Sequence, residues 1–399
     1  MELIKKYSLL TLLAMVIGLL VGVIDTIFGR TLLWIGDLRT HYFLFVIPFL
    51  ALAGLLIVFL YQKWGAKASK GMGLVFQVGH GEEEKIPKRL IPLVMVTTWL
   101  THLFGGSAGR EGVAVQLGAT IGHWFAVRLP QFDLSKVLLV TGMAAGFAGL
   151  FQTPLAATFF ALEVLVVGEL FLPALYPALL ASLVASWTSH ALGLEKFSQA
   201  VEVSLAWTPE ILLKLALLGI VFGFCGKGFA LALSWSKQKV AGWLPNPYLR
   251  IGILGVLLSI LFFILGMGRY SGLGTNLISA SFAGQTITSY DWLLKLLLTV
   301  LALSAGYQGG EVTPLFAMGA SLGVVLAGLF GLPLPLVAAL GYASVFGSAT
   351  STLIGPILIG GEVFGFVNLP YFIIVCSLAF SINHKISIYG GQKILKNSL

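Results

Sequence analysis

Long apolar runs recur along the whole of this chain, separated by short polar or glycine-rich breaks. Several runs approach the roughly 20 residues with which an α-helix spans a bilayer, and others are too short to do so. We find no alternating pattern of ten-residue strands of the kind that builds an outer-membrane barrel. The pattern predicts an all-α, polytopic membrane protein with many tilted and partly broken helices. The runs cover residues 9–27, 42–61, 90–104, 137–151, 211–233, 251–267, 292–305, 312–332 and 371–380.

The composition supports the same class of protein. The chain is 58% hydrophobic and 10% charged, with a mean hydropathy of +0.96, whereas soluble domains carry about 25% charged residues. The first run, residues 9–27, has no clear small-residue cleavage site behind it, and further spans follow. We therefore expect a retained first helix and not a cleaved signal peptide.

The basic residues gather before the first run, between residues 63 and 89, and near the C-terminus. Positively charged segments beside membrane spans stay in the cytoplasm. We therefore expect a multi-pass protein of the cell (plasma or inner) membrane with both termini in the cytoplasm. This bias explains the net charge of +8, so nucleic acid is not expected as a partner. The basic residues near the C-terminus are Lys385, Lys393 and Lys396.

The sequence predicts neither a metal nor a cofactor. Zinc, P-loop and dinucleotide motifs are absent in usable form. Cys225 and Cys376 stand alone in apolar surroundings, where cysteine behaves as a small buried hydrophobe. His102 and His123 are isolated as well, and we expect them to be packing or interface residues.

The chain repeats itself once. Three anchors recur in the same order at nearly constant spacing, a pattern that is hard to produce by chance. We expect a single transmembrane domain, residues 1–399, made of two repeats, about 1–200 and 201–399, with a linker at 194–209. Transporters commonly use inverted repeats, with the transport site at the repeat interface. The anchors are Gly71-Met72-Gly73 with Gly272-Leu273-Gly274, Glu111 with Glu311, and residues 142–163 with 341–362.

Two glutamates, Glu111 and Glu311, lie at matching places in the repeats, each behind a glycine and beside a long apolar run. Asp and Glu together number 16 in 399 residues, and a carboxylate at membrane depth is costly, so it marks a functional site by default. Glycine lets backbone N–H groups approach a ligand, and a helix N-terminus offers an anion unpaired donors and a positive dipole end. The pattern predicts an anion pathway built from two halves.

Glu111 has a specific chemistry at such a site. Its carboxylate is itself an anion and can occupy the place of a permeant anion. Once it takes a proton it can leave that place, which links anion movement to proton movement. The alternative is a structural carboxylate paired with Arg110.

These residues resemble motifs of the CLC family of chloride channels and transporters. The resemblance runs from about residue 9 to residue 389 and so covers nearly the whole chain. The motifs are specific when taken together. Residues 109–113 (GREGV) resemble the family's GREGP signature, 71–74 (GMGL) its GSGIP position, 309–314 (GGEVTP) its GxFxP position, and 142–146 (GMAAG), 151–155 (FQTPL) and 161–163 (ALE) its GMAAG…FNAPL…EE stretch.

Several positions depart from the chloride-transporting pattern. Met72 replaces the family's anion-coordinating serine, and Val113 replaces the proline of GREGP. Val312 replaces the phenylalanine of GxFxP, between Glu311 and Thr313. This combination resembles the fluoride-exporting branch, the CLC-F fluoride/proton antiporters.

One further departure concerns the proton route. Val164 replaces the second acid of the EE pair, which passes protons from the inside in chloride/proton exchangers of the family. The internal proton route is therefore open at the level of sequence. The candidates are Glu311, water and a rotation of Glu111 itself.

The resemblance implies a homodimer in the lipid bilayer, with inverted repeats, a separate pathway in each subunit, and fluoride and protons as the transported ions. Glu111 would be the gating glutamate that exchanges protons, and Tyr389 would contact the inner anion site. The chain ends ten residues after Tyr389, so no cytoplasmic regulatory domain is expected. The anion pathway would include Met72, Gly73, Gly109, Arg110, Gly112, Val113, Glu311, Val312, Thr313 and Tyr389.

Other functions stay open at this point. The preference for fluoride rests on the resemblance, because a methionine offers no strong donor; a chloride/proton exchanger or a passive anion channel is the alternative. A remote alternative is an intramembrane serine hydrolase, since Ser107 and Ser321 both stand in GxSxG patterns. That reading requires a strand–turn–helix elbow with a placed histidine and acid, which a helical membrane context disfavours. We expect Glu163 and Glu362 to cap or pack helices.

Overall fold

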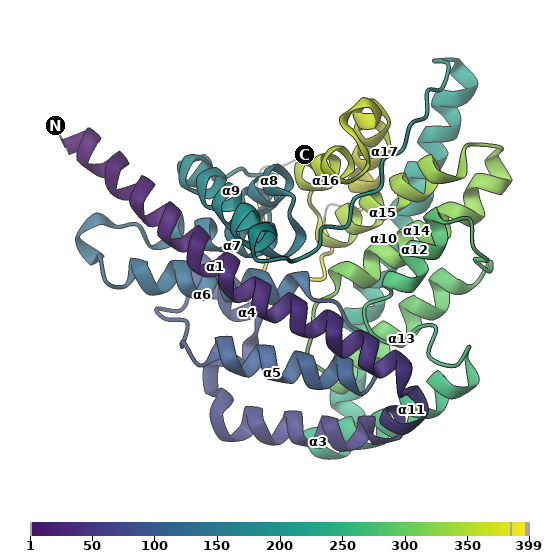
Figure 1. Ribbon diagram of the computed structural model, residues 1–399, viewed down its shortest axis with the longest axis horizontal. Helices are drawn as coiled ribbons and strands as arrows, with labels where there is room; N and C mark the ends of the chain where they lie inside the picture. Colours follow the sequence, from purple (N-terminus) through teal and green to yellow (C-terminus); the bar gives the residue numbers. More distant parts are fainter. Residues whose placement is uncertain (1, 384, 396–399) are drawn as a thin grey trace.

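The computed structural model describes residues 2–383 and 385–395 and is built almost wholly of helices (Figure 1). Lys396 lies outside the described residues. The first half contains α1 (Glu2–His41), α2 (Phe43–Val46), α3 (Leu50–Leu60), α4 (Met72–Gly79), α5 (Leu90–Leu103), α6 (Glu111–Ala126), α7 (Ser135–Phe151), α8 (Pro154–Glu163) and α9 (Leu175–Ala191). The second half contains α10 (Pro209–Trp243), α11 (Pro247–Ile264), α12 (Thr275–Phe282), α13 (Asp291–Ala305), α14 (Val312–Phe330), α15 (Leu334–Thr350), α16 (Ile354–Phe364) and α17 (Leu369–Ile382). Two short strands, β1 (Val166–Val167) and β2 (Lys393–Ile394), pair in parallel.

The predicted multi-pass helical architecture is confirmed. Within the described residues, six stretches are long and apolar enough to cross a membrane. The helix α1 has 40 residues, or about 60 Å at the usual rise, roughly twice the thickness of the hydrocarbon core. It runs obliquely across the other helices of the first half (Figure 1), as a helix longer than the bilayer does when it tilts. The six stretches are residues 5–41, 43–79, 172–191, 209–243, 247–264 and 312–330.

Close glycine contacts hold the core of each half together. An added Cβ at Gly118 in α6 would collide with the carbonyl oxygen of Gly142 in α7. The same relation recurs in the second half, between Gly319 of α14 and Gly341 of α15. Small residues at such crossings let membrane helices approach closely. The duplicated glycines therefore explain why the pairs α6/α7 and α14/α15 pack alike.

One apolar run is not the single helix that its length suggests. Residues 42–61 divide into α2, a 3₁₀ turn over Ile47–Phe49, and α3, which continues as a π-helical turn over Tyr61–Gly65. Pro48 stands at the start of the 3₁₀ turn, where a residue without an N–H interrupts the helical ladder. The chain then bends at Gly71, whose φ of +52° suits glycine, and α4 starts at the next residue.

The irregular segment between α9 and α10 is the predicted linker. Its backbone donates two hydrogen bonds to the second half of the chain, from Gln199 N to Val363 O at 2.9 Å and from Val201 N to Phe364 O at 3.1 Å. Together with the contacts between α8 and α16, these bonds bring the first and second halves side by side, as the colours of Figure 1 show.

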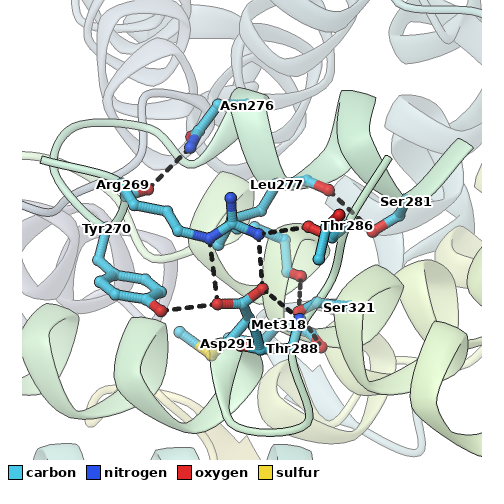
Figure 2. A network of polar contacts seen from close by, with 11 residues as sticks. Arg269, Tyr270, Asn276, Leu277, Ser281, Thr286, Thr288, Asp291, Met318 and Ser321 are labelled. Atoms are coloured by element: carbon cyan, nitrogen blue, oxygen red, sulfur yellow. Dashed lines mark hydrogen bonds and ion pairs between the residues drawn. The ribbon is translucent and has the colours of Figure 1, made fainter. Parts of the chain in front are cut away.

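A carboxylate network links the loops on either side of α12 (Figure 2). Asp291 accepts hydrogen bonds from Arg269 Nε at 3.1 Å and Nη2 at 2.6 Å, and from Tyr270 Oη at 2.6 Å. It also accepts one from the backbone N–H of Thr288 at 2.8 Å. Because Asp291 opens α13, this network ties the loops before and after α12 to one helix end.

Candidate ion-pathway site

Two glycine turns bring the N-termini of α6 and α14 together. Gly109 and Gly310 form an antiparallel bridge, with Gly310 N donating to Gly109 O at 2.8 Å and Gly109 N donating to Gly310 O at 2.5 Å. A Cβ on Gly109 would lie 2.8 Å from Pro314 Cδ and 3.0 Å from Gly310 O. Glycine is therefore required for this approach. The bridge brings the helix starts that carry Glu111 and Glu311 together.

The carboxylate of Glu111 lies on the N-terminus of the opposite helix, α14. Its Oε2 accepts from Thr313 N at 3.1 Å and from Thr313 Oγ1 at 2.5 Å, and more weakly from Arg110 N at 3.3 Å. Glu111 is 1% exposed. Backbone N–H donors and the dipole of α14 stabilise a negative charge here, so the carboxylate occupies a ready-made anion site.

Arg110 does not lock Glu111 in place. Its Nε is 3.7 Å from Glu111 Oε1, which is longer than a hydrogen bond. Within the part of the chain that the structure describes, Nε and Nη1 of this buried guanidinium have no hydrogen-bond partner. The Glu111 carboxylate is thus hydrogen-bonded to α14 and also forms a longer, buried ion pair with Arg110.

A cavity of about 320 Å³ opens next to these helix starts. It is lined by the beginning of α4, by Gly112 and Gln116 of α6, by residues 306–311, by Lys237 of α10 and by the segment after α17. It therefore brings together five predicted pathway residues from four separate parts of the chain. These are Met72, Gly73, Gly112, Glu311 and Tyr389.

Other predicted pathway residues do not line this cavity. Val113 and Val312 are buried in the first turns of α6 and α14 and are not among its lining residues. Gly109, Arg110 and Thr313 belong to the adjoining contact around Glu111. Their place in the pathway stays a prediction.

Tyr389 presents an unused hydroxyl group to the cavity. The side chain is 5% exposed, and its ring packs 5.4 Å from the ring of Phe76. Among the described residues its Oη has no hydrogen-bond partner. A buried phenol without a partner is rare and costly, so this hydroxyl is a donor available to an anion in the cavity. Met72 lines the same space with a thioether, which is not a donor.

Glu311 faces this cavity, which the start of α6 also lines. Its side chain is 13% exposed, and its Oε1 lies 3.8 Å from Lys237 Nζ. A Cβ on Gly112 would lie 3.9 Å from Glu311 Oε2, an ordinary van der Waals distance, so this carboxylate lies close to the start of α6. The two glutamates therefore divide the site: one is sealed on α14, and the other lines the cavity.

The glutamates at the ends of the third pair of anchors are helix caps, as predicted. Glu163 at the end of α8 accepts from the backbone N–H groups of Leu353, Ile354 and Gly355 at the start of α16. Glu362 in α16 accepts from Leu155 and Ala156 at the start of α8. Carboxylates are favourable at helix N-termini, so each half caps a helix of the other.

The hydrolase alternative lacks its geometry. Ser107 Oγ bonds to Thr299 Oγ1 at 2.8 Å and accepts from Lys295 Nζ at 2.9 Å. Ser321 Oγ donates to Ala317 O within its own helix. His102 bonds through both ring nitrogens to backbone carbonyls, in a packing role. None of these contacts forms the serine, histidine and acid arrangement that a hydrolase needs.

The sequence analysis missed two lysines. Lys295 is fully buried in α13 and donates to Ser107 Oγ, to Tyr270 O at 3.1 Å and to Gly272 O at 2.7 Å. A single charge inside the apolar run 292–305 was the signal that marks it. Lys237 carries no such signal, because it pairs with a residue far away in the sequence. The described residues hold no group of three or more metal-binding side chains.

Known proteins resemble this chain in sequence and fold. The model of the voltage gated chloride channel family matches residues 53–384. A solved CLC-type fluoride/proton antiporter is 59% identical, covers 98% of this chain and 99% of its own, and superposes with a TM-score of 0.97. A chloride/fluoride channel protein of Pseudomonas syringae pv. tomato is 34% identical over 363 residues, which cover 88% of this chain and 78% of the relative.

A more distant structure shares the fold alone. A slow cyanobacterial Cl⁻/H⁺ antiporter is 22% identical, with a TM-score of 0.79 over 94% of this chain and 93% of its own. The fold thus persists where most residues differ. Motifs, helix arrangement and these matches agree, and the chain belongs to the voltage gated chloride channel family, the CLC family, as its motifs predicted.

Proposed function

We propose that this protein is a fluoride/proton antiporter that exports fluoride from the cytoplasm in exchange for protons. The observation that carries the proposal is the Glu111 carboxylate on the N-terminus of α14, held by the N–H and hydroxyl groups of Thr313. The 59% identity to a CLC-type fluoride/proton antiporter over nearly the full length of both chains supports the choice of ions.

The chemistry of the site links the two ions. An ionised Glu111 takes the donors that a permeant anion would use, so the anion and the carboxylate compete for α14. Protonation turns the carboxylate into a neutral acid with weaker attraction to the helix dipole, and the anion then replaces it. The protein therefore exchanges an outgoing anion for a proton at one place, and it is a transporter and not an enzyme.

Fluoride suits the donors at this site. It is a small, strongly hydrated anion, and it must exchange water for strong donors. Thr313 supplies a hydroxyl and an N–H next to Glu111, and Tyr389 supplies a hydroxyl in the cavity. Chloride-transporting relatives resembled by these motifs carry a phenylalanine at the place of Val312 and a serine at the place of Met72. Neither replacement adds a donor, so the fluoride preference is supported by the resemblance and by the 59% identity to a CLC-type fluoride/proton antiporter.

We propose one transmembrane domain with two inverted repeats, about 1–200 and 201–399, and both termini in the cytoplasm. The loop between α4 and α5 contains Lys85, Lys88 and Arg89, while the equivalent loop between α12 and α13, residues 283–290, has no basic residue. The positive-inside rule therefore supports opposite sides for these loops. The reciprocal caps at Glu163 and Glu362 support a two-fold relation between the halves. The family resemblance supports a homodimer with one pathway per subunit.

Purified protein in liposomes loaded with fluoride or chloride tests the function. An electrode follows the anion leaving the liposomes, and a pH electrode follows protons entering them. We expect fluoride efflux with proton uptake and little chloride movement. Chloride efflux as fast as that of fluoride would exclude the fluoride preference, and fluoride efflux without protons would exclude antiport.

A further inference from the structure

Lys237 is a cation in the cavity that the motifs do not explain. It lies in the last part of α10 and is half-exposed, with a side-chain exposure of 45%, while its partner Glu311 is 13% exposed. Both line the same cavity of about 320 Å³, together with Lys70, Gln116 and Tyr389. The Lys237 ammonium therefore reaches both water and the carboxylate beside the helix starts.

The Lys237–Glu311 contact is built loosely. The two charged atoms are 3.8 Å apart, beyond the range of a hydrogen bond, and half-exposed ion pairs of this kind contribute little to stability. Lys70, the other lysine of the cavity, is held differently: its Nζ donates to Gln77 Oε1 at 2.9 Å and to Glu83 Oε1 at 3.2 Å. Lys237 is thus the cavity cation that can change partners at low cost.

We propose that Lys237 is a docking site for fluoride at the inner end of the pathway, and that docked fluoride takes the place of Glu311 as the partner of the ammonium. The proposal rests on the proposed function and adds a site to it. An ammonium offers three donors, and a lysine-lined mouth concentrates anions. The unpartnered hydroxyl of Tyr389 is the next donor in the same cavity.

Docking has a consequence for Glu311. The charged or titratable groups around it are Lys237 from α10, Glu111 from α6, Tyr307 and Lys70 at the cavity wall, and Tyr389 after α17. When fluoride neutralises Lys237, Glu311 keeps a poorly hydrated position without its countercharge, which favours its protonated form. The proton that arrives through Glu111 passes to the Glu311 carboxylate. It leaves for the cytoplasm when fluoride moves on and Lys237 pairs with Glu311 again.

This assignment fills the gap left by Val164. That residue is fully buried and apolar, so it is neither a proton donor nor an acceptor. Glu311 is a carboxylate in the cavity beside the Gly109–Gly310 bridge, and in this proposal its protonation is coupled to the binding of fluoride at Lys237. The docking site thus couples fluoride entry to proton discharge on the same side of the protein.

Proton uptake on fluoride addition tests the proposal in detergent solution. Sodium fluoride is added to weakly buffered Glu111→Gln protein, which removes the proton exchange of Glu111, and the pH is recorded against a protein-free blank. We expect a rise in pH that disappears when Lys237→Met or Glu311→Gln is added to this background. Lys239→Met, an exposed lysine on the same helix and outside the cavity lining, should leave the rise intact, and Lys237→Arg should retain most of it.

Size-exclusion chromatography confirms that each variant is folded. Absence of a pH rise in the Glu111→Gln background, or a rise that Lys237→Met leaves unchanged, would overturn the docking site. For the liposome experiment, Lys237→Met and Lys239→Met are each made in the wild-type background. Lys237→Met should raise the internal fluoride concentration for half-maximal efflux about tenfold relative to Lys239→Met. This is the effect expected for the loss of one ionic hydrogen bond. If wild-type protein moves fluoride without protons, the proposed function fails; if it couples both ions and Lys237→Met matches Lys239→Met, only the docking site fails.

Discussion

The two halves place a glutamate at the same helix start, yet these glutamates have opposite surroundings. Glu111 is sealed from water and hydrogen-bonded to the far helix, α14. Glu311 lines a cavity and faces a lysine at 3.8 Å. The residue two places on decides the difference, because Thr313 supplies a hydroxyl to Glu111, whereas Val113 offers none to Glu311. A duplicated backbone thus builds both helix starts, and the side chains assign their roles.

A second pair of equivalent glutamates behaves in the opposite way. Glu163 and Glu362 cap each other's half with the same kind of contact, carboxylate to backbone N–H. Here the halves have kept one role for both residues. The two halves thus use one contact for both members of this pair and different contacts for Glu111 and Glu311.

The largest expected effect comes from Glu111→Gln. The amide keeps the size of the side chain but takes up no proton, so fluoride movement should lose its coupling to protons completely. Simultaneous fluoride and pH recordings on liposomes measure this loss. Glu169→Gln, an exposed glutamate away from the site, is the matched control and should remain coupled. Coupled transport by Glu111→Gln would remove the distinction between the two glutamates.

Lys295→Met should reduce stability strongly. The substitution leaves Gly272 O and Tyr270 O without their buried donor, and we expect a loss of about 3 kcal/mol from such unsatisfied groups. A lower temperature of unfolding in detergent, measured by the loss of the monodisperse peak after heating, checks this. An unchanged unfolding temperature would mean that Lys295 does not stabilise the turn before α12.

Thr313→Val tests the hydroxyl group that distinguishes the two helix starts. The loss of one hydrogen bond to a charged group costs about 1.5 to 3 kcal/mol, and each 1.4 kcal/mol is tenfold in affinity. We therefore expect the fluoride concentration for half-maximal efflux to rise at least tenfold. Fewer protons should be exchanged for each fluoride. Thr313→Ser keeps the hydroxyl and should behave like the wild type. Equal effects of the two substitutions would show that the methyl group, and not the donor, matters.

Glu163→Gln and Glu362→Gln should have similar and moderate effects. Each substitution removes the charge at a helix N-terminus and weakens its cap, at a cost of about 1 kcal/mol. The unfolding temperature should fall by a similar amount in both variants, while the ratio of protons to fluoride stays as in the wild type. A change of that ratio in one variant alone would break the symmetry that we assign to this pair.

The smallest expected effect concerns the loop between α4 and α5. Hydrogen bonds from Lys67 and then Lys70 lower the pKa of Glu83. A lowered pKa in the folded protein adds stability above the ordinary value of about 4.3, and this contribution is lost as the pH falls through the lowered value. Glu83→Gln should therefore slightly reduce stability at neutral pH. The variant should then lose less stability than the wild type as the pH falls. Unfolding temperatures at a series of acidic pH values measure this, and identical profiles would contradict it.

The sequence predicted the class of fold, for physical reasons. Apolar runs and glycine turns are local patterns, and the proposed repeat is a periodic one. Such patterns can be recognised in the sequence alone, so they predicted the helices and the positions of both glutamates. Reciprocal caps between α8 and α16 were foreseen only as capping in general. Lys237 was not foreseen, because nothing near position 237 indicates that α10 approaches position 311. The division of α2 and α3 depended on Pro48, a local signal that the length of the apolar run concealed.

Uphill transport tests the central claim most directly. Wild-type protein is placed in liposomes with equal fluoride inside and outside, and acid is added outside to create an inward proton gradient. If Glu111 exchanges a proton for fluoride on α14, the fluoride electrode will record net efflux against the growing fluoride gradient, and the Glu111→Gln variant will show none. Fluoride that stays at equilibrium in wild-type liposomes under the same proton gradient would contradict proton-coupled export.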